Sequence, residues 1–381
     1  MAQTYDFVVA GGSIAGLTFA AEAAKRGARV LVAEEHPEIG EPEKCDGLVS
    51  LRGLRKFGYP PAAEVVQDRL TSIQIHTPSD RKFRVDANAL EVVVLDRSAF
   101  DKQVARTAES NGAEIMTGSR VGAVAPVAGG VDVSVGDGSV RGSYFVDATG
   151  PSSSPRRGIL PAAKYELEAD WVTPGEVEVF LDAERYPGFF AWIIPYGKRL
   201  AKVGAAGRGV SPFRALDGFL SGRYFKVLRR VSAPIFVGGP TPRFVEGRRI
   251  FVGESAGQVK PTTAGGIMTS IAGATVAAKW ACAALSKGEP GLVSRYQAEW
   301  EGTFLKEMKS MLRLRGVLEK LSNADFEALS SLATPRLIQK LSHGDFDFHA
   351  TAIFGALSVQ GLLKVEKVVA SAEVRSILVD G

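Results

Sequence analysis

The first 35 positions of the chain combine two short apolar runs with a stretch of helical periodicity. Residues 5–10 (YDFVVA) and 28–34 (ARVLVAE) each predict a buried strand, and residues 17–26 between them predict a helix. A strand, a helix and a second strand within about 30 residues are typical of a βαβ unit in a parallel sheet. The chain therefore opens with the elements of an α/β fold.

The middle of the chain has shorter apolar runs. Strands are predicted over 70–85, 91–95, 114–116, 131–135 and 144–147, and a helix over 97–111. Between 165 and 207 apolar and polar positions alternate instead, with Val177 and Val179 on one side, which predicts an inserted antiparallel sheet. Residues 248–253 predict a buried strand and, after a glycine-rich loop, residues 268–286 predict an apolar helix. The chain beyond this point is predicted to be mostly helical.

We interpret this order as an α/β fold with three parts. A Rossmann-like nucleotide-binding domain with a parallel sheet is predicted over 1–65, 96–160 and 235–290, and an antiparallel-sheet substrate domain over 66–95 and 161–234. A helical region is predicted over 291–381. A chain of 381 residues is too long for one simple core, so two or three domains are expected.

Composition narrows the class of protein. Hydrophobic residues make up 45% and charged residues 23% of the chain, which is ordinary for a soluble globular protein. The net charge of +4 is too small to favour a nucleic-acid partner, and the chain has no long Lys/Arg run. The N-terminus has no basic leader, and there is no run of about 18 uncharged apolar residues. Neither a signal peptide nor a membrane-spanning helix is therefore expected.

Cysteines and histidines give no sign of a metal site. Cys45 and Cys282 lack the number and spacing of a disulfide framework or a metal site, so a cytoplasmic, reducing location is expected, with one bridge between them left open. Cys282 falls within an apolar helix and is expected to be a small buried core residue. The four histidines share no spacing, and no metal site is expected.

Residues 304–318 form a basic amphipathic stretch. Its basic residues are Lys306, Lys309, Arg313 and Arg315. Such a stretch either touches anionic lipid or is an ordinary surface helix packed on the core. Peripheral contact with a membrane surface is therefore left open.

Residues 11–16 (GGSIAG) occupy the place of a G-x-G-x-x-G turn, with Ser13 at the second glycine. In such turns the first glycine permits the tight bend, the second position lets the backbone approach a pyrophosphate, and the third lets the helix pack closely. The phosphates then meet the positive end of the helix. Glu34 stands at the end of the second strand, where an acid accepts hydrogen bonds from a ribose diol. The pattern predicts a dinucleotide site formed by Gly11, Ser13, Ala15, Gly16 and Glu34.

Residues 251–267 (FVGESAGQVKPTTAGGI) are predicted to form the end of a strand, a loop and the start of a helix. A helix N-terminus beside a glycine pair suits the electron-rich edge of a flavin ring, and Glu254 could bond to a ribityl hydroxyl. Gly265, Gly266 and Ile267 are therefore candidate cofactor contacts. A plain strand–helix connection with capping residues is the alternative.

The order of these motifs resembles a known group of proteins. GGSIAG with Glu34, DRSAFDKQVA, VDATG and VGESAGQVKPTTAGGI together resemble the para-hydroxybenzoate-hydroxylase-type flavoproteins. Within that group PEIGEPEKCDGL (37–48), GFFAWIIPYGKRLAKVGAAG (188–207) and GQVKPTTAGGI resemble the geranylgeranyl reductase family, whose archaeal members saturate the prenyl chains of membrane ether lipids. The resemblance covers residues 5–287 well and the C-terminal helices loosely, and it implies FAD as the cofactor.

Several positions depart from the pattern of that family. Ser13 replaces a glycine, Glu254 stands where aspartate is usual, Ala264 stands where glycine is frequent, and Ile194 stands where phenylalanine is frequent. The loop is also one residue shorter after Cys45. These departures bear on cofactor affinity and substrate choice more than on the fold.

The resemblance also implies roles for further residues. Arg97 would contact the flavin and the backbone of Val121 the adenine, although a solvated helix-start arginine and an ordinary strand valine are the alternatives. The loop carrying Cys45 would lie over the flavin, with backbone contacts from Asp46 and Gly47. Cys45 is the catalytic candidate, and it either donates a proton to the alkene or only lines the pocket.

Aromatic residues cluster in 188–207. Alternate residues of a strand share a face, so Phe190 and Trp192 are predicted to lie on one face and Phe189 and Ala191 on the other. An aromatic face over a flavin would form an apolar channel for a prenyl chain, and an ordinary hydrophobic core is the alternative. The candidate substrate contacts are Phe190, Trp192, Pro195 and Tyr196.

The predicted function is FAD-dependent reduction of isolated double bonds in a prenyl lipid, with hydride from the reduced flavin N5 atom and a proton from another source. Two rival functions remain. The first is a flavin monooxygenase or halogenase with the same fold, and the second is a prenyl-lipid carrier that has lost the flavin. The electron donor, either a ferredoxin-like protein or NAD(P)H, and the oligomeric state are left open.

Overall fold

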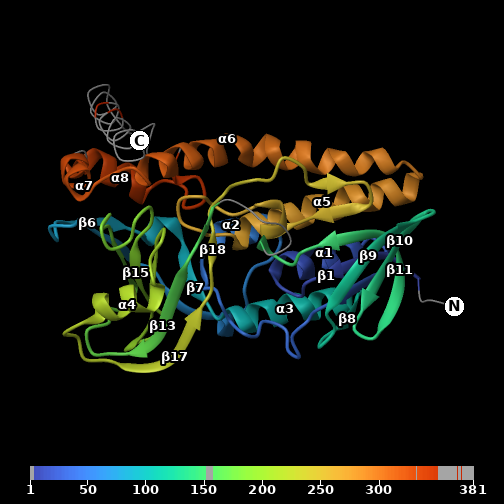
Figure 1. Cartoon of the computed structure of the whole chain (residues 1–381), viewed down its shortest axis with the longest axis horizontal. Coiled ribbons are helices and arrows are strands. Elements are labelled where there is room, and N and C mark those ends of the chain that lie inside the picture. Colours follow the sequence, from blue (N-terminus) through green and yellow to red (C-terminus); the bar gives the residue numbers. More distant parts are fainter. Residues whose placement is uncertain (1–3, 152–157, 332, 351–366, 368–369, 371–381) are drawn as a thin grey trace.

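The structure is a computed structural model that describes residues 4–151, 158–331 and 333–350, together with positions 367 and 370. Figure 1 shows two halves side by side, with α1 and α5 on the right, the sheet that carries β13 and β15 on the left, and α6 running above both. Apart from positions 367 and 370, the part of the predicted helical region beyond 350 lies outside the described residues.

The first sheet combines strands from both ends of the predicted nucleotide-binding domain. Its strands are β1 Thr4–Ala10, β2 Val30–Ala33, β8 Glu114–Met116, β9 Val121–Val127, β10 Gly130–Val135, β11 Gly138–Asp147, β19 Val245–Glu246 and β20 Arg249–Phe251. Strands β20, β11, β1, β2 and β8 are parallel in that order. Strands β9 and β10 join β11 as an antiparallel ribbon. The predicted α/β class and the opening strand–helix–strand unit are confirmed.

The two faces of this sheet are covered differently. Alternate residues of a strand point to opposite faces, so Phe7 and Val9 of β1 pack with the helices, whereas Val8 packs on the opposite side with Val131 and Val133 of β10. The helical layer consists of α1 Ile14–Ala24, α3 Arg97–Ser110 and α5 Ile267–Lys287. The β9–β10 ribbon therefore replaces the second helical layer of a doubly wound fold.

Helix α5 lies in the core. Among the described residues it is the one helix that is long and apolar enough to cross a membrane by length and composition, and 67% of its apolar window is buried inside the protein. It packs along α1, and its buried residues include Ile271, Ala274 and Ala278. Packing between helices explains its apolar composition.

The second sheet has seven strands. They are β5 Ser72–His76, β6 Lys82–Asp86, β13 Ala162–Glu168, β14 Glu176–Phe180, β15 Ala191–Pro195, β16 Leu200–Ala206 and β17 Lys226–Ser232. The order is β17-β13-β16-β15-β14-β5-β6. The predicted antiparallel sheet is confirmed, and it includes one parallel pair, β14 with β5. Helix α4, Pro212–Leu220, covers the far face of this sheet.

Shorter elements connect the halves. They are β3 Leu48–Ser50, α2 Leu51–Lys56, η1 Ala63–Val65, β4 Val66–Arg69, η2 Asn88–Leu90, β7 Val92–Leu95, β12 Ile159–Leu160, β18 Ile235–Phe236, η4 Gly253–Ala256 and η5 Pro290–Ser294. Strands β3, β7 and β4 form a small antiparallel sheet. The predicted domain boundaries remain a prediction, although the two large sheets use strands from the segments assigned to each domain.

The C-terminal helices are α6 Arg295–Leu318, α7 Asn323–Ser330 and α8 Pro335–Ser342. Lys306, Lys309 and Arg313 are exposed on α6, whereas Arg315, the fourth basic residue of this stretch, is buried. Arg315 pairs with Glu319 at 2.7 Å, and its guanidinium carbon lies 5.8 Å from the ring centroid of Phe189. Helix α6 therefore packs on α5 and also contacts Phe189, which lies just before β15 of the second sheet.

Candidate functional site

The turn between β1 and α1 has the geometry that its glycines predict. Gly11 has φ +103°, and a Cβ atom there would lie 2.6 Å from the carbonyl oxygen of Ala148. A Cβ atom at Gly16 would collide with the carbonyl oxygen of Gly11. Ser13 precedes α1, is exposed, and its side chain makes no capping hydrogen bond to the helix. The exposed hydroxyl and the first turn of α1 are suited to a phosphate group.

The carboxylate of Glu34 closes the same turn from the end of β2. Its Oε2 atom accepts a hydrogen bond of 2.6 Å from the backbone N–H of Gly12, and its Oε1 atom accepts one of 2.9 Å from that of His36. The backbone N–H of Ser119 donates to the Glu34 carbonyl at 2.7 Å, which places the start of β9 with Val121 near this strand end. Glu34 thus lies beside the turn, as the ribose position requires.

The second predicted loop packs directly on the first. A Cβ atom at Gly253 would lie 2.6 Å from the Cβ atom of Ala15, so only glycine allows this approach. Gln258 fixes the loop, because its side-chain oxygen accepts from the N–H of Gly253 at 2.9 Å and its amide donates to Tyr296 at 2.8 Å. The structure therefore brings Ala15 and the 251–267 segment together, although they are far apart in the sequence.

The start of α5 presents the backbone of Gly265, Gly266 and Ile267. The N–H groups of a first helical turn have no partner within the helix and can donate to a ligand. Ala264 precedes them with φ +55°, in the left-handed region that favours glycine. The left-handed backbone at this position thus explains why glycine is frequent there in the resembled family.

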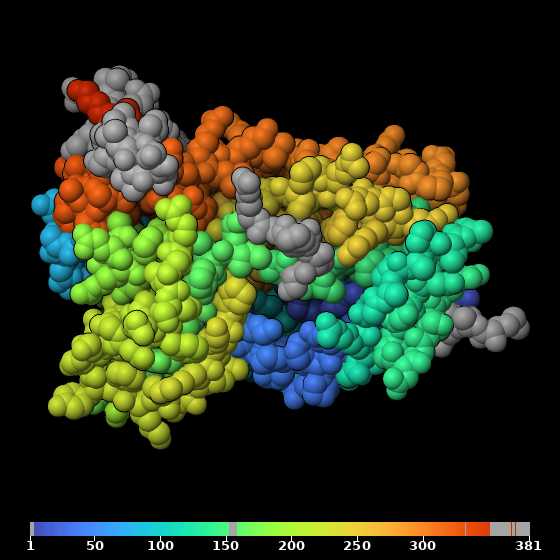
Figure 2. Space-filling view, in the orientation of Figure 1, coloured from blue at the N-terminus to red at the C-terminus, as the bar shows by residue number. Residues whose placement is uncertain are grey.

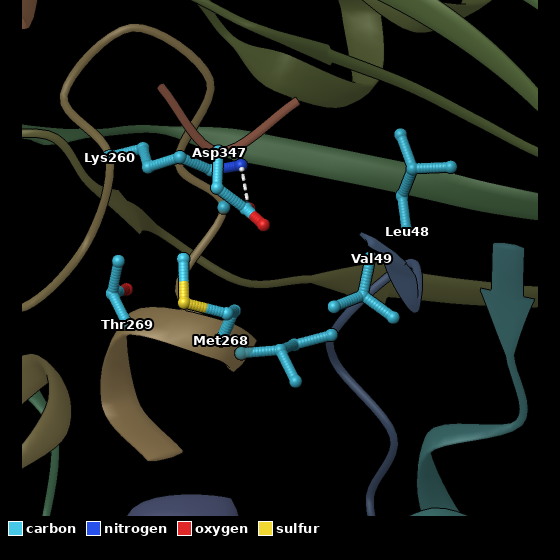
Figure 3. Close-up of a pocket in the computed structure, with 8 residues that line it drawn as sticks. Leu48, Val49, Lys260, Met268, Thr269 and Asp347 are labelled. Atoms are coloured by element: carbon cyan, nitrogen blue, oxygen red, sulfur yellow. Dashed lines mark hydrogen bonds and ion pairs between the residues drawn. The ribbon is translucent and has the colours of Figure 1, made fainter. Parts of the chain in front are cut away.

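Contacts from the C-terminal segment were not predicted from the sequence. Lys260 and Asp347, both buried, form an ion pair of 3.1 Å between the 251–267 loop and this segment, and Figure 3 shows them at the wall of a small cavity. Thr262 Oγ1 lies 2.7 Å from His349 Nε2. The lining also includes Leu48, Val49, Gly265, Ile267, Met268 and Thr269. No pattern within the loop itself indicates that Asp347 lies 87 residues away as its partner.

Arg97 lies at the centre of the site. It is buried and pairs with Asp101 at 2.9 Å, and although burial alone would lower the pKa of Arg97, Asp101 and the Cys45 thiol raise it. Burial raises the pKa of Glu254, and the positive charge of Arg97 opposes that rise. The interpretation of Arg97 as a solvated helix-start residue is wrong, because Arg97 is buried and paired with Asp101.

Cys45 lies on an irregular loop between the halves. Its side chain is exposed, and its Sγ atom accepts a hydrogen bond of 3.5 Å from the N–H of Gly47. Gly47 has φ +82°, and a Cβ atom there would collide with the carbonyl oxygen of Leu95. Asp46 Oδ1 lies 3.2 Å from Lys164 Nζ. Both cysteines are free, so the open alternative of a bridge between Cys45 and Cys282 is not realised.

The aromatic segment forms one wall rather than two faces. Phe189 and Phe190 stack with centroids 4.0 Å apart, and both are edge-on to Trp192 at about 6 Å. The prediction that Phe189 lies opposite Phe190 and Trp192 is wrong, because β15 begins only at Ala191 and the strand alternation does not reach back to Phe189. Tyr196 packs against the same cluster, and Pro195 is buried at the end of the strand.

Trp192 lies flat over Gly204 of the neighbouring strand, where any Cβ atom would collide with the indole ring. The indole N–H is buried and has no hydrogen-bond partner among the described residues. The Nε atom of Arg97 and the hydroxyl of Ser98 are also buried without such a partner. Unpaired buried polar groups are costly, so these atoms are suited to the polar groups of a ligand.

The site residues thus fit an FAD molecule. Gly11, Ser13, Gly16 and Glu34 would hold the pyrophosphate and adenosine half, with the N-terminus of α1 toward the phosphates. Arg97, Glu254 and the start of α5 would hold the flavin half. Cys282 takes no part, because it lies in α5 against Ala23, and burial raises the pKa of its thiol to about 11.

Comparisons with known proteins give the same picture. Residues 6–153 match a family model described as FAD dependent oxidoreductase. The chain is 30% identical over 357 residues to digeranylgeranylglycerophospholipid reductase 2 of Methanothermobacter thermautotrophicus, covering 85% of this chain and 90% of that protein. It is also 30% identical over 358 residues to digeranylgeranylglycerophospholipid reductase 1 of Methanopyrus kandleri, covering 84% and 95%.

Among solved structures, a geranylgeranyl bacteriochlorophyll reductase-like protein from Thermoplasma acidophilum superposes with a TM-score of 0.86 at 22% identity, covering 96% of this chain and 98% of that one. A flavin-dependent brominase superposes with a TM-score of 0.69 at 16% identity, covering 98% and 99%. At these identities the two structures establish the fold alone, and that fold is shared by the reductase-like protein and the brominase.

Proposed function

The chain belongs to the digeranylgeranylglycerophospholipid reductase family, and from that premise we propose that it saturates isolated double bonds in the geranylgeranyl chains of a membrane phospholipid. It is an FAD-dependent oxidoreductase. The geometry that carries the proposal is the packing of the 251–267 loop on the dinucleotide turn at Gly253 and Ala15, with the aromatic wall of Phe189, Phe190 and Trp192 in the other half of the molecule.

The protein residues would bind and orient the cofactor and the substrate, and the bound flavin would supply the redox chemistry. FAD, when bound and reduced, supplies the hydride from its N5 atom. Arg97 and Glu254 would fix the flavin half, and Phe190, Trp192 and Tyr196 would form the apolar surface that orients a prenyl chain. Because an isolated alkene is not polarised, a proton must reach the carbon that does not take the hydride.

Cys45 is the proposed source of that proton. Its thiol is exposed on the loop between the halves and lies beside Arg97.

A peripheral membrane contact is the proposed route to a lipid substrate. Lys306, Lys309 and Arg313 are exposed on α6, with Leu312 36% exposed beside them. Figure 2 shows α6 as the upper exposed edge of the molecule. Replacing the three cations with glutamine should weaken sedimentation with vesicles that contain anionic lipid, without affecting FAD content. Equal sedimentation of the parent and the variant would remove α6 from the membrane contact.

The reaction itself is testable without knowing the electron donor, whether a ferredoxin-like protein or NAD(P)H. FAD-loaded protein is reduced chemically and mixed without oxygen with digeranylgeranylglycerophospholipid in detergent. We expect the flavin to be reoxidised in a single turnover and the lipid to gain two hydrogen atoms for each bond reduced, as measured by mass spectrometry. An unchanged lipid, with reoxidation only after oxygen is admitted and an oxygenated or halogenated product when an aromatic substrate and a halide are supplied, would favour the monooxygenase or halogenase alternative.

A further inference from the structure

The face of the second sheet that looks toward Cys45 carries buried cations as well as aromatic residues. Lys164 of β13 is 4% exposed, Lys202 of β16 is 1% exposed, and Arg229 of β17 is partly buried. In the strand register Lys202 lies opposite Ile194, and Arg229 lies opposite Glu166, which is two residues after Lys164. The three cations therefore share one face with the aromatic wall.

All three cations donate to backbone carbonyls of the 41–47 loop. Lys164 Nζ donates to the carbonyl of Cys45 at 2.9 Å, and Lys202 Nζ to that of Asp46 at 3.3 Å. A guanidinium nitrogen of Arg229 donates to the carbonyl of Glu43 at 3.0 Å. Three strands of the sheet thus hold three carbonyls of one short loop.

The carboxylates of the same loop complete these contacts. Asp46 pairs with Lys164 at 3.2 Å, and Glu43 pairs with Lys202 at 2.8 Å and with Arg229 at 3.6 Å. Burying a lysine is costly unless it is paired, and buried ion pairs add little net stability compared with apolar residues of the same size. The stability of the protein alone therefore does not explain why two lysines are buried on this face of the sheet. Their contacts with the 41–47 loop do explain it, because they fix the path of that loop.

The other side of the loop is fixed by β7 of the small connecting sheet. The N–H of Leu95 donates to the carbonyl of Gly47 at 3.0 Å, and the left-handed turn at Gly47 leaves no room for a side chain. Cys45 thus lies on a segment that is held by the second sheet on one side and by the small connecting sheet on the other. Lys202 also contacts the aromatic wall, with its Nζ atom 5.4 Å from the ring centroid of Tyr196.

We propose that Lys164 and Lys202 are positioning residues that hold the backbone around Cys45, so that its thiol stays beside Arg97. They act through Cys45 and do not touch the reacting atoms. The positioning of the loop follows from the contacts alone, and only its effect on the reduction of a lipid rests on the proposed function.

Backbone hydrogen exchange of the FAD-loaded protein tests the positioning. Lys164→Met keeps most of the side-chain volume and removes the cation, and Lys198→Met, in the exposed turn between β15 and β16, is the control. Losing a hydrogen bond to a charged group implies at least about tenfold faster exchange in a peptide spanning 41–47. Exchange equal to that of the parent and the control would overturn the proposal. Lys202→Met provides an independent variant, and Lys164→Arg should restore slow exchange.

The link to Cys45 is tested by a double-mutant cycle on the anaerobic single turnover. We expect Lys164→Met to slow the reductive step about tenfold, with FAD content and lipid affinity unchanged, and to cause no further slowing in the Cys45→Ala background. Equal slowing in both backgrounds would show that Lys164 does not act through Cys45. If no variant or parent reduces the lipid, the proposed function fails, whereas the exchange experiment still decides the positioning.

Discussion

The dinucleotide turn at Gly11–Gly16 and the Cys45 loop at 41–47 are built in opposite ways. The turn is shaped by the absence of side chains, since a Cβ atom at Gly11 or Gly16 would overlap a backbone oxygen. The loop is shaped by side chains from elsewhere, with Lys164 and Lys202 reaching its carbonyls from strands more than 100 residues later. A site shaped by backbone sterics carries a recognisable local motif, whereas one held by distant ion pairs leaves no signature within the loop.

The largest effect is expected from a substitution that disrupts the dinucleotide turn. Gly16→Ala places a methyl group against the carbonyl oxygen of Gly11, so the start of α1 must move away from the phosphate position. We expect the purified protein to contain no FAD, as measured by its absorbance spectrum. Gly122→Ala, which meets only Ser134 Cβ at 3.5 Å, should retain the full amount and is the matched control. Full FAD content in Gly16→Ala would contradict the assignment of this turn to the cofactor.

The next largest effect is expected at the Cys45 loop, where a substitution should slow the reaction but leave FAD binding intact. Cys45→Ala should keep FAD and lipid binding and slow the reductive step by roughly a hundred- to ten-thousand-fold, the usual contribution of a general acid. Cys45→Ser should also be slow, because a hydroxyl is a far weaker acid than a thiol. The measurement is anaerobic reoxidation of chemically reduced enzyme by the lipid. A loss of only a few-fold in both variants would mean that Cys45 lines the pocket and that another group gives the proton.

A pH effect tests the long-range contacts around the 251–267 loop. Burial, with the charge of Lys260 adding to it, lowers the pKa of His349 from 6.5 to about 4. The unfolded chain therefore takes up a proton before the folded protein as pH falls below 6.5, and stability is lost in that window. The two pKa values imply a loss of about 2 kcal/mol between pH 7 and pH 5. Denaturant unfolding at both pH values measures it, and His349→Gln should reduce the difference by that amount.

The smallest expected effect concerns Ala264. At φ +55° an alanine is strained, so Ala264→Gly should raise the free energy of unfolding by about 0.5–1 kcal/mol. Ala283→Gly, inside α5, should lower it by about 1 kcal/mol because glycine is a poor helix former. Thermal unfolding of the two variants should therefore shift in opposite directions. A shift of both to lower temperature would show that Ala264 is not strained.

The same contrast explains which structural features the sequence could predict. Strands β1 and β2, helices α3 and α5, and the turn with Glu34 follow from apolar periodicity and glycine spacing, and the structure has them close to the expected residues. Strand β9 was not among the predicted strands, because its run of small residues, Val121–Val127, lacks a strong alternating pattern. The parallel pairing of β5 with β14 could not be predicted either, because strand direction depends on the path of the chain between them.

Site residues show the same division. Glu34 and Gly16 could be placed by spacing from one motif, whereas Arg97 and Cys45 needed the resemblance to a known family. Lys260 and Lys202 were missed altogether, because a buried lysine and an exposed one look alike in a sequence and differ only in their distant partners. The cofactor assignments themselves remain predictions for each residue, and the variants above test them.

Helix α6 has a mechanical consequence for substrate entry. It is a continuous rod of 24 residues, about 36 Å long, and it packs on α5 of one half while Arg315 lies over Phe189 of the other. A hinge that separated the halves would have to bend this rod or strip Arg315 from the aromatic wall. We therefore expect the two halves to keep their relative positions when a long hydrocarbon chain enters, so that movements of individual side chains, rather than closure of the halves, admit the substrate.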